Sequence, residues 1–563
     1  MSRQDYFFNP TTQQRHQLLL DALTLSGRTE DYENILALLS PPPDISYYAE
    51  PNALRNIRIG IIGAGLAGLS AAYELRKLGA DITLFDAQQD RIGGRVYTLY
   101  FDEAKQYYGE FGALRIPVSH ETTWHYIDLF NLNTQSLASP QSNNFIYAHE
   151  TRIRREPSGR TITEKLYPQY ALTKAEAKTP WPELRNYALE TMLNSLSTEQ
   201  RTEILKILPR YSDAYATITK LSNRQVFEQL ALSQGAISLL SAVEPLTGSL
   251  FDVSHDEIMS SSYSLDFVNV YRIQGGMAHL PSAFYNSLMN ANPPENTYPP
   301  HLLGKVDMRL GQSVKGISKP LNQKEIILHY SRFDGCEVQD SFDYVVCAIP
   351  FSTLRTIEIT PFFSNQKMQA IKELNYLDAQ KTLFLCRKRF WEENEPYGNI
   401  NGGTSFTDLP IQSILYPTDH ILNDSSKPYA FNEPGVLTAS YNLGQDAVRL
   451  SNQNIFHRLN LIKENVERVH GLPSRYLNAL LTTYKTVHWN TQHWSRGAFA
   501  MNDPGQKVNF SFAALKPEYN NRIFFAGEHV SAKQGWMQGS LYTGKAAANE
   551  IAQHSQSYGQ RVQ

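Results

Sequence analysis

The chain has 563 residues, of which 42% are apolar and 11% aromatic. This is enough apolar material for more than one hydrophobic core, and it favours a globular protein of two or three domains. The 52 basic and 55 acidic residues give a formal net charge of -3, and neither sign forms a long run. This balance argues against a nucleic-acid or anionic-membrane surface and indicates small-molecule partners.

The N-terminal segment, MSRQDYFFNPTTQQRHQLLLDAL, has no apolar core of signal-peptide length. No stretch of the chain approaches the roughly 18 apolar residues that a membrane span needs. We therefore expect a cytoplasmic protein without a membrane span. Apolar residues at helical spacing between residues 11 and 40 end at three prolines, which predicts an N-terminal helical arm and linker.

Residues 58–86, RIGIIGAGLAGLSAAYELRKLGADITLFD, have the pattern of a nucleotide-binding strand, turn, helix and strand. Gly63, Gly65 and Gly68 have the spacing that allows a tight turn, a close approach to a pyrophosphate and close packing of helix on strand. Asp86 ends the second strand, where its carboxylate can accept hydrogen bonds from a ribose diol. Together these features predict a dinucleotide site.

A second glycine-rich element follows in DRIGGRVYT. Gly94 and Arg95 fit a second approach to the same pyrophosphate, because backbone N–H groups and a guanidinium both bind phosphate oxygens. The three cysteines, Cys336, Cys347 and Cys386, suit neither a zinc site nor a disulfide framework. No metal site is predicted.

Beyond the glycine-rich elements, the predicted secondary structure changes along the chain. A long stretch with helical spacing follows residue 120, short β-rich segments such as FDYVVCAIP and KTLFLCRKRFW return later, and the C-terminal region has the pattern of a strand, a loop and a helix. We expect β-strands that are divided between two domains, with a helical insertion.

These elements resemble the FAD-dependent amine oxidase superfamily, in which the glycine turn, the acid and the GGR element bind the ADP half of FAD. FFAGEH resembles the family's C-terminal flavin-binding element, with Gly527 and Glu528, and Val314 occupies the position of a residue that contacts adenine. The resemblance covers residues 57–130 and 271–550. It implies that FAD contacts Gly63, Gly65, Leu66, Ala67, Gly68, Asp86, Ala87, Gly94, Arg95, Gly112, Ala113, Leu114, Arg115, Val314, Gly527, Glu528, Trp536, Met537 and Ser540.

The implied fold class is α/β and α+β, the amine oxidase fold: a Rossmann-like FAD-binding domain, a β-sheet substrate domain and a helical insertion. The expected divisions are an arm and linker at 1–55, FAD-binding segments at 56–120, 271–345 and 486–563, a helical and substrate-domain insertion at 121–270, and a substrate-binding domain at 346–485.

Within the superfamily, three details resemble the L-amino-acid oxidases. Arg115, in GEFGALRIP, occupies the position of the arginine that holds the substrate carboxylate, and a guanidinium suits that role because it presents two parallel N–H donors. Tyr416 matches a tyrosine that donates to the same carboxylate. Gly535 matches a glycine whose carbonyl accepts from the substrate amine, and Trp536 with Phe499 resembles an aromatic sandwich around the reacting carbon.

Two further positions bear on the cofactor. Lys381 resembles a lysine that holds a water beside flavin N5 and helps dioxygen accept electrons. Ala498 stands where monoamine oxidases carry a cysteine for covalent attachment, so we expect FAD without a covalent bond. One departure from the family is Gln412, where many relatives have an arginine, and any contact that this arginine supports is in doubt.

The resemblance implies oxidative deamination of an L-amino acid, by hydride transfer from Cα to flavin N5 and reoxidation by O2, to a 2-oxo acid, ammonium and hydrogen peroxide. It also implies a homodimer. Three alternatives stay open: an amino-acid 2-monooxygenase that forms an amide, an oxidase of monoamines or polyamines, and a non-catalytic flavoprotein scaffold. His255, Asp256 and Glu257 could approach a basic substrate side chain, although a polar loop explains them equally well.

Overall fold

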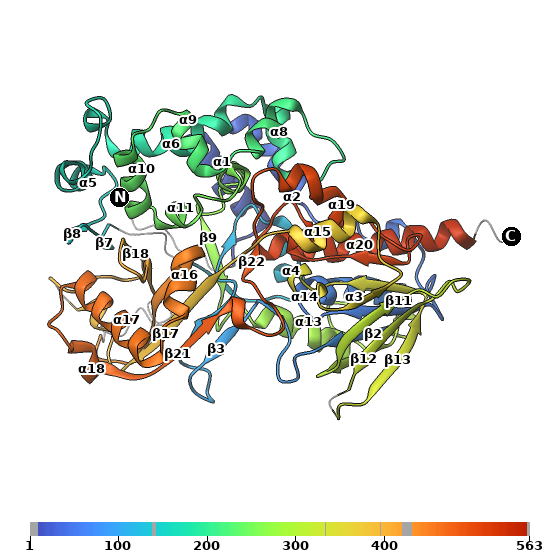
Figure 1. The fold of residues 1–563 in the computed structure, drawn as a ribbon. Helices are drawn as coiled ribbons and strands as arrows, with labels where there is room; N and C mark the ends of the chain where they lie inside the picture. The colour runs from blue at the N-terminus through green and yellow to red at the C-terminus, as the bar shows by residue number, and fades with distance from the viewer. Residues whose placement is uncertain (1–8, 138–141, 333, 394–395, 419–430, 560–563) are drawn as a thin grey trace.

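The computed structural model describes residues 9–137, 142–332, 334–393, 396–418 and 431–559. Figure 1 shows three regions: a parallel sheet with its helices at the lower right, a larger sheet at the lower left, and a group of helices above both. The site lies where these three regions meet.

Five strands from distant parts of the chain form one parallel sheet in the order β10-β2-β1-β14-β23. Their bounds are Val306–Leu310, Asp81–Asp86, Arg58–Ile62, Tyr344–Cys347 and Ile523–Phe525. Because all five run in the same direction, their carboxyl ends meet at one edge, which is where open α/β sheets bind ligands.

Both faces of this sheet are covered, as the apolar runs of its strands predict. Ile59 and Ile61 pack in one core cluster with the helices α3 (Leu66–Lys77), α13 (His279–Met289) and α20 (Met537–Gly559). Ile62 and Phe85 belong to a second cluster, which includes residues of a four-stranded sheet on the opposite face. That sheet comprises β11 (Ser313–Ser318), β12 (Ile326–Ser331), β13 (Glu337–Phe342) and β15 (Glu358–Thr360).

The larger sheet has seven strands in the order β21-β17-β20-β19-β18-β7-β8. Their bounds are Leu481–His488, Ala379–Cys386, Gly435–Leu443, Ser413–Tyr416, Gly403–Thr407, Phe145–Ala148 and Thr151–Arg154. Helix α17 (Ile455–His470) packs on one face of it through an apolar cluster. Strands β14 and β21 run across the boundaries expected at residues 345 and 485, so these sheets do not divide exactly at those positions.

Two groups of helices complete the fold. The helical region between the strands β8 and β9 (Val270–Ile273) includes α6, α8, α9, α10 and α12, with bounds Trp181–Ser195, Asp213–Thr219, Asn223–Gln229, Gln234–Val243 and His255–Tyr263. The N-terminal arm forms α1 (Thr12–Leu25) and α2 (Tyr32–Leu39), whose leucines pack in the same core cluster as α3 and α20. The arm is therefore part of the folded body.

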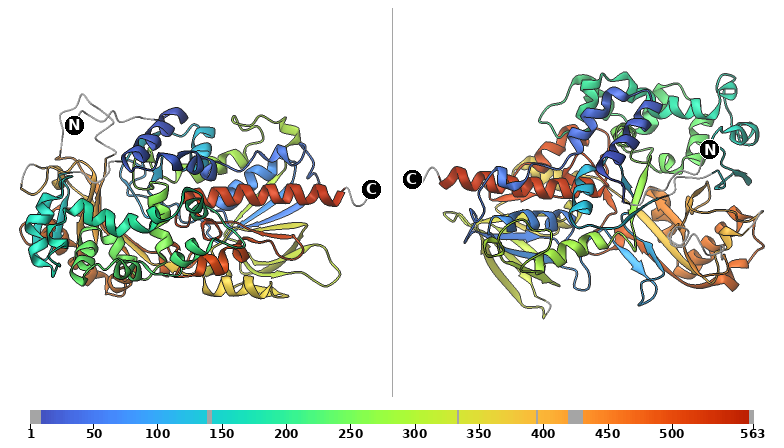
Figure 2. Two further views of the ribbon diagram at one scale, coloured as in Figure 1. Left: turned by 90° about the horizontal axis from the view of Figure 1, so that it is seen from above. Right: turned by 180° about the vertical axis from the view of Figure 1, so that it is seen from behind.

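Several short elements connect these regions. They are the hairpin β3 (Thr98–Tyr100) and β4 (Tyr108–Glu110), the strands β5 (Ile116–Pro117), β6 (Thr134–Ser136) and β9 in one small sheet, and the pair β16 (Tyr376–Leu377) and β22 (Phe499–Ala500). The views in Figure 2 show α20 running along the parallel-sheet region and extending past it to the C-terminus.

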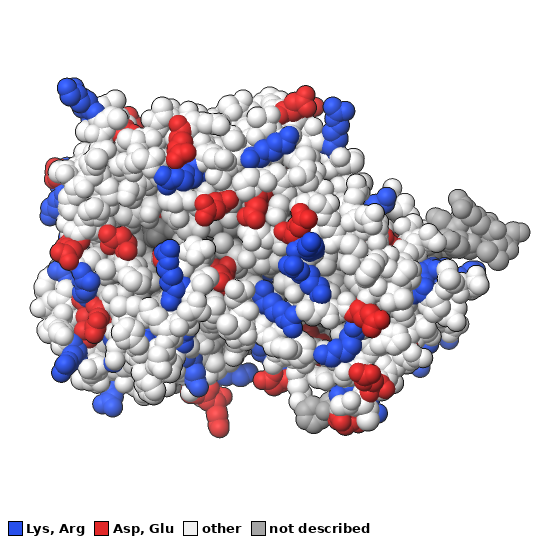
Figure 3. Space-filling model, viewed as in Figure 1, with Lys and Arg blue, Asp and Glu red and all other residues white. Residues whose placement is uncertain are grey.

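The surface has no strong segregation of charge on the face shown in Figure 3, where basic and acidic side chains are interspersed. Among the described residues, no helix combines the length and apolar character required to span a membrane.

Candidate active site

The glycine turn between β1 and α3 leaves open space at its tip. Gly63 has φ +105°, a conformation that favours glycine. A Cβ added at Gly65 would have no neighbour within 4 Å, whereas one at Gly68 would lie 1.9 Å from the carbonyl oxygen of Gly63. Gly65 therefore leaves room at the amino end of α3, where a helix favours anions. Gly68 instead allows the helix to pack on the turn.

Asp86 ends β2 beside this turn, and backbone N–H groups hold its carboxylate. Ala64 N donates to it at 2.7 Å and Gln88 N at 2.8 Å. Burial raises the pKa of Asp86, and the two backbone hydrogen bonds oppose that rise. Each carboxylate oxygen has further accepting capacity, so Asp86 is placed to receive hydroxyl donors from a ligand in the cavity.

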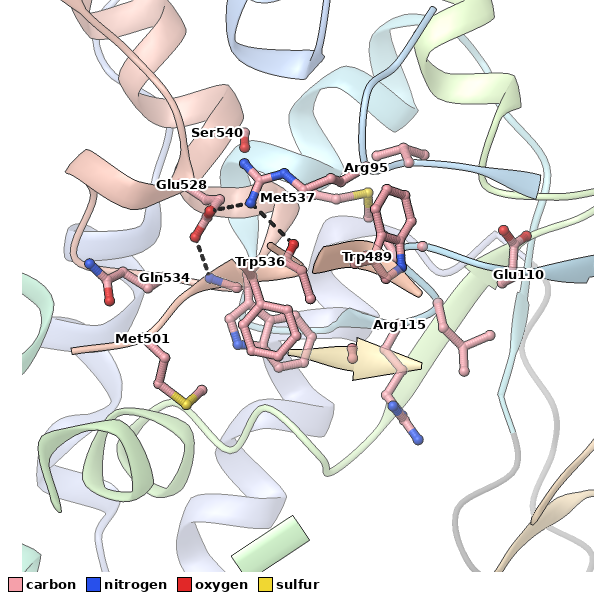
Figure 4. A pocket seen from close by; sticks show the side chains of 18 of the residues that line it. Arg95, Glu110, Arg115, Trp489, Met501, Glu528, Gln534, Trp536, Met537 and Ser540 are labelled. Atoms are coloured by element: carbon pink, nitrogen blue, oxygen red, sulfur yellow. Dashed lines mark hydrogen bonds and ion pairs between the residues drawn. The ribbon is translucent and has the colours of Figure 1, made fainter. Parts of the chain in front are cut away.

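An ion pair joins the GGR element to the C-terminal FFAGEH segment. Arg95 Nη1 contacts Glu528 Oε1 at 2.6 Å, across 433 residues of chain. The other oxygen of Glu528 accepts from Gly535 N at 2.8 Å and from Ala500 N at 3.3 Å. Figure 4 shows Glu528 between Arg95 and the backbone that leads to Trp536. This carboxylate therefore holds the GGR element and the Gly535 loop together.

These elements surround one cavity of about 1250 Å³. Its volume exceeds the roughly 300–1,000 Å³ of an ordinary small-molecule pocket, which leaves room for a dinucleotide and a second ligand. Of the predicted site residues, only Gly68 does not line it. The others are Gly63, Gly65, Leu66, Ala67, Asp86, Ala87, Gly94, Arg95, Gly112, Ala113, Leu114, Arg115, Val314, Lys381, Tyr416, Phe499, Gly527, Glu528, Gly535, Trp536, Met537 and Ser540.

Arg115 presents a guanidinium to this cavity. It lies just before β5, and its Cζ is 5.7 Å from the ring centroid of Phe267. Burial lowers the pKa of Arg115 and the nearby Tyr441 opposes that shift, but an arginine stays charged at any physiological pH. Within the described part of the chain, no carboxylate forms an ion pair with Arg115. A partly buried cation without a protein counter-ion is suited to bind an anionic ligand.

The tyrosine beside Arg115 is Tyr441, which was not among the residues predicted from the sequence. Tyr441 on β20 lies directly opposite Lys381 on β17. The Lys381 Nζ is 4.7 Å from the Tyr441 ring centroid, and the charge of Arg115 acts on the Tyr441 hydroxyl. Its strand is recognisable in PGVLTASYNLGQDA, but which of its side chains face the cavity depends on the pairing of the strands.

Tyr416 lines the same cavity, but its hydroxyl is bonded elsewhere. It donates to Ser405 Oγ at 2.8 Å and lies 3.0 Å from His470 Nε2, in the apolar cluster beneath α17. The predicted contact of this hydroxyl with a substrate carboxylate therefore has no support from the geometry. Gln412, the departure from the family in this segment, donates from Nε2 to Asp446 Oδ2 at 2.8 Å and has a structural role.

Lys381 is buried, and its ammonium donates to the backbone. Its Nζ is 2.8 Å from Gly112 O and 3.1 Å from Glu110 O. Burial lowers the pKa of Lys381 to about 7, while Glu110 opposes the shift and Arg115 adds to it. Burial also raises the pKa of Glu110 to about 7, although Met277 N and Thr98 Oγ1 donate to its carboxylate. Both groups line the cavity and change charge near neutral pH.

Aromatic rings form another wall. A Cβ at Gly535, where φ is +76°, would lie 3.2 Å from the Phe499 ring, so this ring packs against the loop before Trp536. Phe267, a residue that the sequence motifs did not indicate, lies 5.7 Å from Trp536 between ring centroids. His120 meets the Trp536 ring edge-on at 4.9 Å and bonds to Asp266 at 3.0 Å.

Asp266 also pairs with Lys533, so that a buried ion pair anchors both the loop carrying Phe267 and the loop carrying Trp536. Breaking such a pair would leave an uncompensated buried charge, so the pair opposes separation of the two loops. Of these rings, Phe267 is the one that lies next to Arg115.

Comparison with known proteins gives concordant results. A family model described as flavin containing amine oxidoreductase matches residues 66–552. An L-amino-acid oxidase of Bothrops atrox is 26% identical over 540 residues, which cover 94% of each chain. An L-amino-acid oxidase of Crotalus adamanteus is 25% identical and covers 89% of this chain and 88% of its own.

Among solved structures, a putrescine oxidase bound to putrescine has a TM-score of 0.65 and 18% identity, over 88% of this chain and 98% of its own. A cyclohexylamine oxidase from Brevibacterium oxydans has a TM-score of 0.64 and 17% identity, over 88% and 99% of the two chains. At these identities the structures show a shared fold.

Proposed function

This chain belongs to the flavin-containing amine oxidoreductases, and on that premise we propose that it is an L-amino-acid oxidase. The observation that carries the proposal is Arg115, a guanidinium that faces the cavity without an ion-pair partner among the described residues. A simple amine has no group to pair with it, whereas the α-carboxylate of an amino acid does. The curated relatives named L-amino-acid oxidase support the same assignment.

The residues around the turn fit the family's FAD. The open space at Gly65 lies where a pyrophosphate approaches the amino end of α3. Asp86 accepts from hydroxyls, and Gln312 Oε1, a buried acceptor without a partner in the described structure, lines the cavity near Val314. We propose that FAD binds without a covalent bond, since Ala498 cannot form one.

The chain's own residues divide the remaining work. Arg115 binds the carboxylate, with Tyr441 in place of Tyr416 as the hydroxyl donor beside it. The carbonyl of Gly535 accepts from the amine, and Phe499 and Trp536 exclude water and orient Cα. When bound by these residues, FAD would supply the two-electron acceptor that oxidation of the amine carbon requires, with dioxygen as the final oxidant.

Lys381 and Glu110 complete the site as the groups that hold protons near neutral pH. We propose that charged Lys381 favours electron transfer to dioxygen by stabilising developing negative charge. The proposed products are a 2-oxo acid, ammonium and hydrogen peroxide. The homodimer and the cytoplasmic location also remain proposals; light scattering of the purified protein tests the first and cell fractionation the second.

The test is an anaerobic mixing experiment with the purified holoenzyme. The twenty L-amino acids and the amines that correspond to their decarboxylated forms are added separately, and the loss of the oxidised flavin absorbance is recorded. We expect amino acids to bleach the flavin and their matching amines not to do so.

Arg115→Ala should raise the amino-acid concentration needed for half-maximal bleaching by about 10- to 100-fold, the effect of losing hydrogen bonds to a charged group. Bleaching by amines alone would overturn the proposal in favour of an amine oxidase. Admitting air and identifying an amide instead of a 2-oxo acid would assign a monooxygenase.

A further inference from the structure

A second polar region of the cavity contains hydrogen-bond acceptors. Glu257 on α12 and Gln534 in the loop before Gly535 both line the cavity. In Figure 4, Gln534 and Met501 lie on one side of Trp536 and the guanidinium of Arg115 on the other. The two regions therefore flank the proposed position of the reacting carbon.

Asn502 holds both Glu257 and Gln534 through hydrogen bonds. Its backbone N donates to Glu257 Oε1 at 3.0 Å and its Nδ2 donates to the same oxygen at 3.1 Å. Gln534 Nε2 donates to Asn502 Oδ1 at 3.5 Å and to His529 O at 3.3 Å. Because these bonds use the amide nitrogen of Gln534, its carbonyl oxygen is left as an acceptor.

The protein leaves both acceptors incompletely matched: Gln534 Oε1 lacks a donor, and Glu257, although Asn502 donates to it, lacks a cation. Gln534 is only 8% exposed, and its Oε1 has no hydrogen-bond partner in the described part of the structure. No basic side chain forms an ion pair with Glu257 among the described residues, because the nearby Lys507 binds Asp256 at 3.0 Å. A buried unsatisfied acceptor and an unpaired carboxylate are both costly unless a ligand satisfies them.

The neighbouring acids of the DVSHDEI segment are used elsewhere. Asp256 is bound by Lys507 and by the Tyr215 hydroxyl, and His255 Nδ1 lies 2.9 Å from Asn223 Oδ1 in the core. Of the three residues considered from the sequence, only Glu257 lines the cavity. The two acceptors thus define a specific subsite rather than a general acidic surface.

We propose that Glu257 and Gln534 form a side-chain subsite that selects L-amino acids ending in an ammonium or guanidinium group. This inference rests on the proposed function, because it assigns the carboxylate of the same substrate to Arg115. Such a side chain supplies a positive charge for Glu257 and N–H donors for both acceptors. Neutral side chains leave the carboxylate unpaired.

The charge of Glu257 itself supports this selectivity. Burial, with Asp256 next, raises its pKa to about 7, so ionising it without a cationic partner is unfavourable. A substrate ammonium would stabilise the ionised form, whereas an apolar side chain would not.

The first test uses matched pairs of substrates. L-Lysine is compared with L-2-aminoheptanoate, in which a methyl group replaces the side-chain ammonium. Ornithine and arginine are added to vary the length of the basic side chain. We expect kcat/KM to favour the best basic substrate by about 10- to 100-fold over its uncharged analogue, the usual effect of a charged hydrogen bond. Glu257→Gln should reduce this ratio to near one and Gln534→Met should reduce it partly.

Glu190→Gln is the control. Glu190 on α6 also lines the cavity, but its carboxylate accepts a hydrogen bond from the Ser262 hydroxyl on α12 at 2.9 Å. It should leave the ratio unchanged. Equal or better use of the uncharged analogues by the wild type, or a ratio that Glu257→Gln does not change, would overturn the proposal.

A binding measurement separates this inference from the proposed function. 6-Aminohexanoate retains the carboxylate and the terminal ammonium of lysine but has no α-amine, and heptanoate lacks the ammonium. Calorimetry with the oxidised holoenzyme should show at least tenfold tighter binding of 6-aminohexanoate, lost in Glu257→Gln. If this holds while no amino acid bleaches the flavin, the subsite is supported and the oxidase assignment fails; if bleaching occurs without this difference, the subsite fails.

Discussion

At the scale of single residues, Arg115, Lys381 and Glu110 bring three ionisable groups to one part of the cavity. Lys381 and Glu110 both have pKa values near 7 because burial disfavours their charged forms. Arg115 stays charged. The charge of this region near neutral pH is therefore decided by a lysine and a glutamate rather than by the arginine that we assign to substrate binding.

The two tyrosines of the larger sheet should respond differently to loss of the hydroxyl. Tyr441→Phe should raise KM for the amino acid by about tenfold, because it removes a donor next to Arg115. Tyr416→Phe should leave KM unchanged and lower the free energy of unfolding by about 1 kcal/mol, because its bonds to Ser405 and His470 lie within the core. Steady-state kinetics and chemical denaturation of both variants check this; a larger KM effect for Tyr416→Phe would contradict the placement.

Glu110 should make stability depend on pH. Its pKa is raised from 4.5 to about 7 in the folded protein. The folded state then binds more protons than the unfolded state between these values, so its contribution is present below pH 4.5 and lost as pH rises through 7. The free energy of unfolding of the wild type should fall relative to that of Glu110→Gln by about 3 kcal/mol across this window.

Denaturant titrations of the two proteins at several pH values measure the difference. Glu103→Gln serves as the control, because Glu103 is exposed in the loop between β3 and β4. If the free energy of unfolding of the wild type changes with pH in parallel with that of Glu110→Gln, the raised pKa of Glu110 is contradicted.

At the scale of elements, the site depends on how short segments meet at the ends of strands and helices. The turn between β1 and α3 positions the amino end of a helix, and Glu528 ties the GGR element to the loop that carries Trp536. Strand pairing places Lys381 opposite Tyr441. Each contact depends on the backbone position of an element as well as on the residue type.

The glycines of the turn provide a matched pair of substitutions. Gly65→Ala should fold normally but bind FAD less tightly, because its Cβ would project into open space where the pyrophosphate is expected. Gly68→Ala should destabilise the protein without FAD by about 1–3 kcal/mol, because its Cβ would lie 1.9 Å from the Gly63 carbonyl oxygen. Melting temperatures of the apoproteins and FAD titrations distinguish the two effects; equal apoprotein stabilities would argue against the observed packing.

At the scale of the whole molecule, one cavity is lined from three regions of the fold. Gly65 and Asp86 come from the parallel-sheet region, Lys381 and Tyr441 from the seven-stranded sheet, and Glu257 from the helical region. A ligand that fills such a cavity contacts all three regions at once. Its binding free energy should therefore stabilise the whole fold.

The apoprotein should become more stable as FAD is added. At 100 times the dissociation constant, FAD should add about 2.7 kcal/mol to the free energy of unfolding, because it binds the folded state alone. Thermal unfolding over a series of FAD concentrations measures the expected rise in Tm, with riboflavin, which lacks the ADP half, as the comparison. A Tm that does not change with FAD would contradict the assignment of the glycine turn.

The sequence by itself identified the family and predicted the nucleotide-binding elements. Gly63, Gly65 and Gly68 indicate their roles because a tight turn and close packing need those residues within a few positions of one another. Arg115 was predicted from the resemblance of GEFGALRIP to a short motif of the family. Such signals are local, so they can be read along the chain.

The tertiary structure alone decided which other side chains surround the site. Tyr441 and not Tyr416 lies beside Arg115, and Glu257 lines the cavity while Asp256 binds Lys507. Successive residues of a strand face opposite sides, and neighbouring residues of a helix point in different directions, so neither choice follows from sequence spacing. These contacts form only when segments hundreds of residues apart are packed together, as Arg95 and Glu528 are.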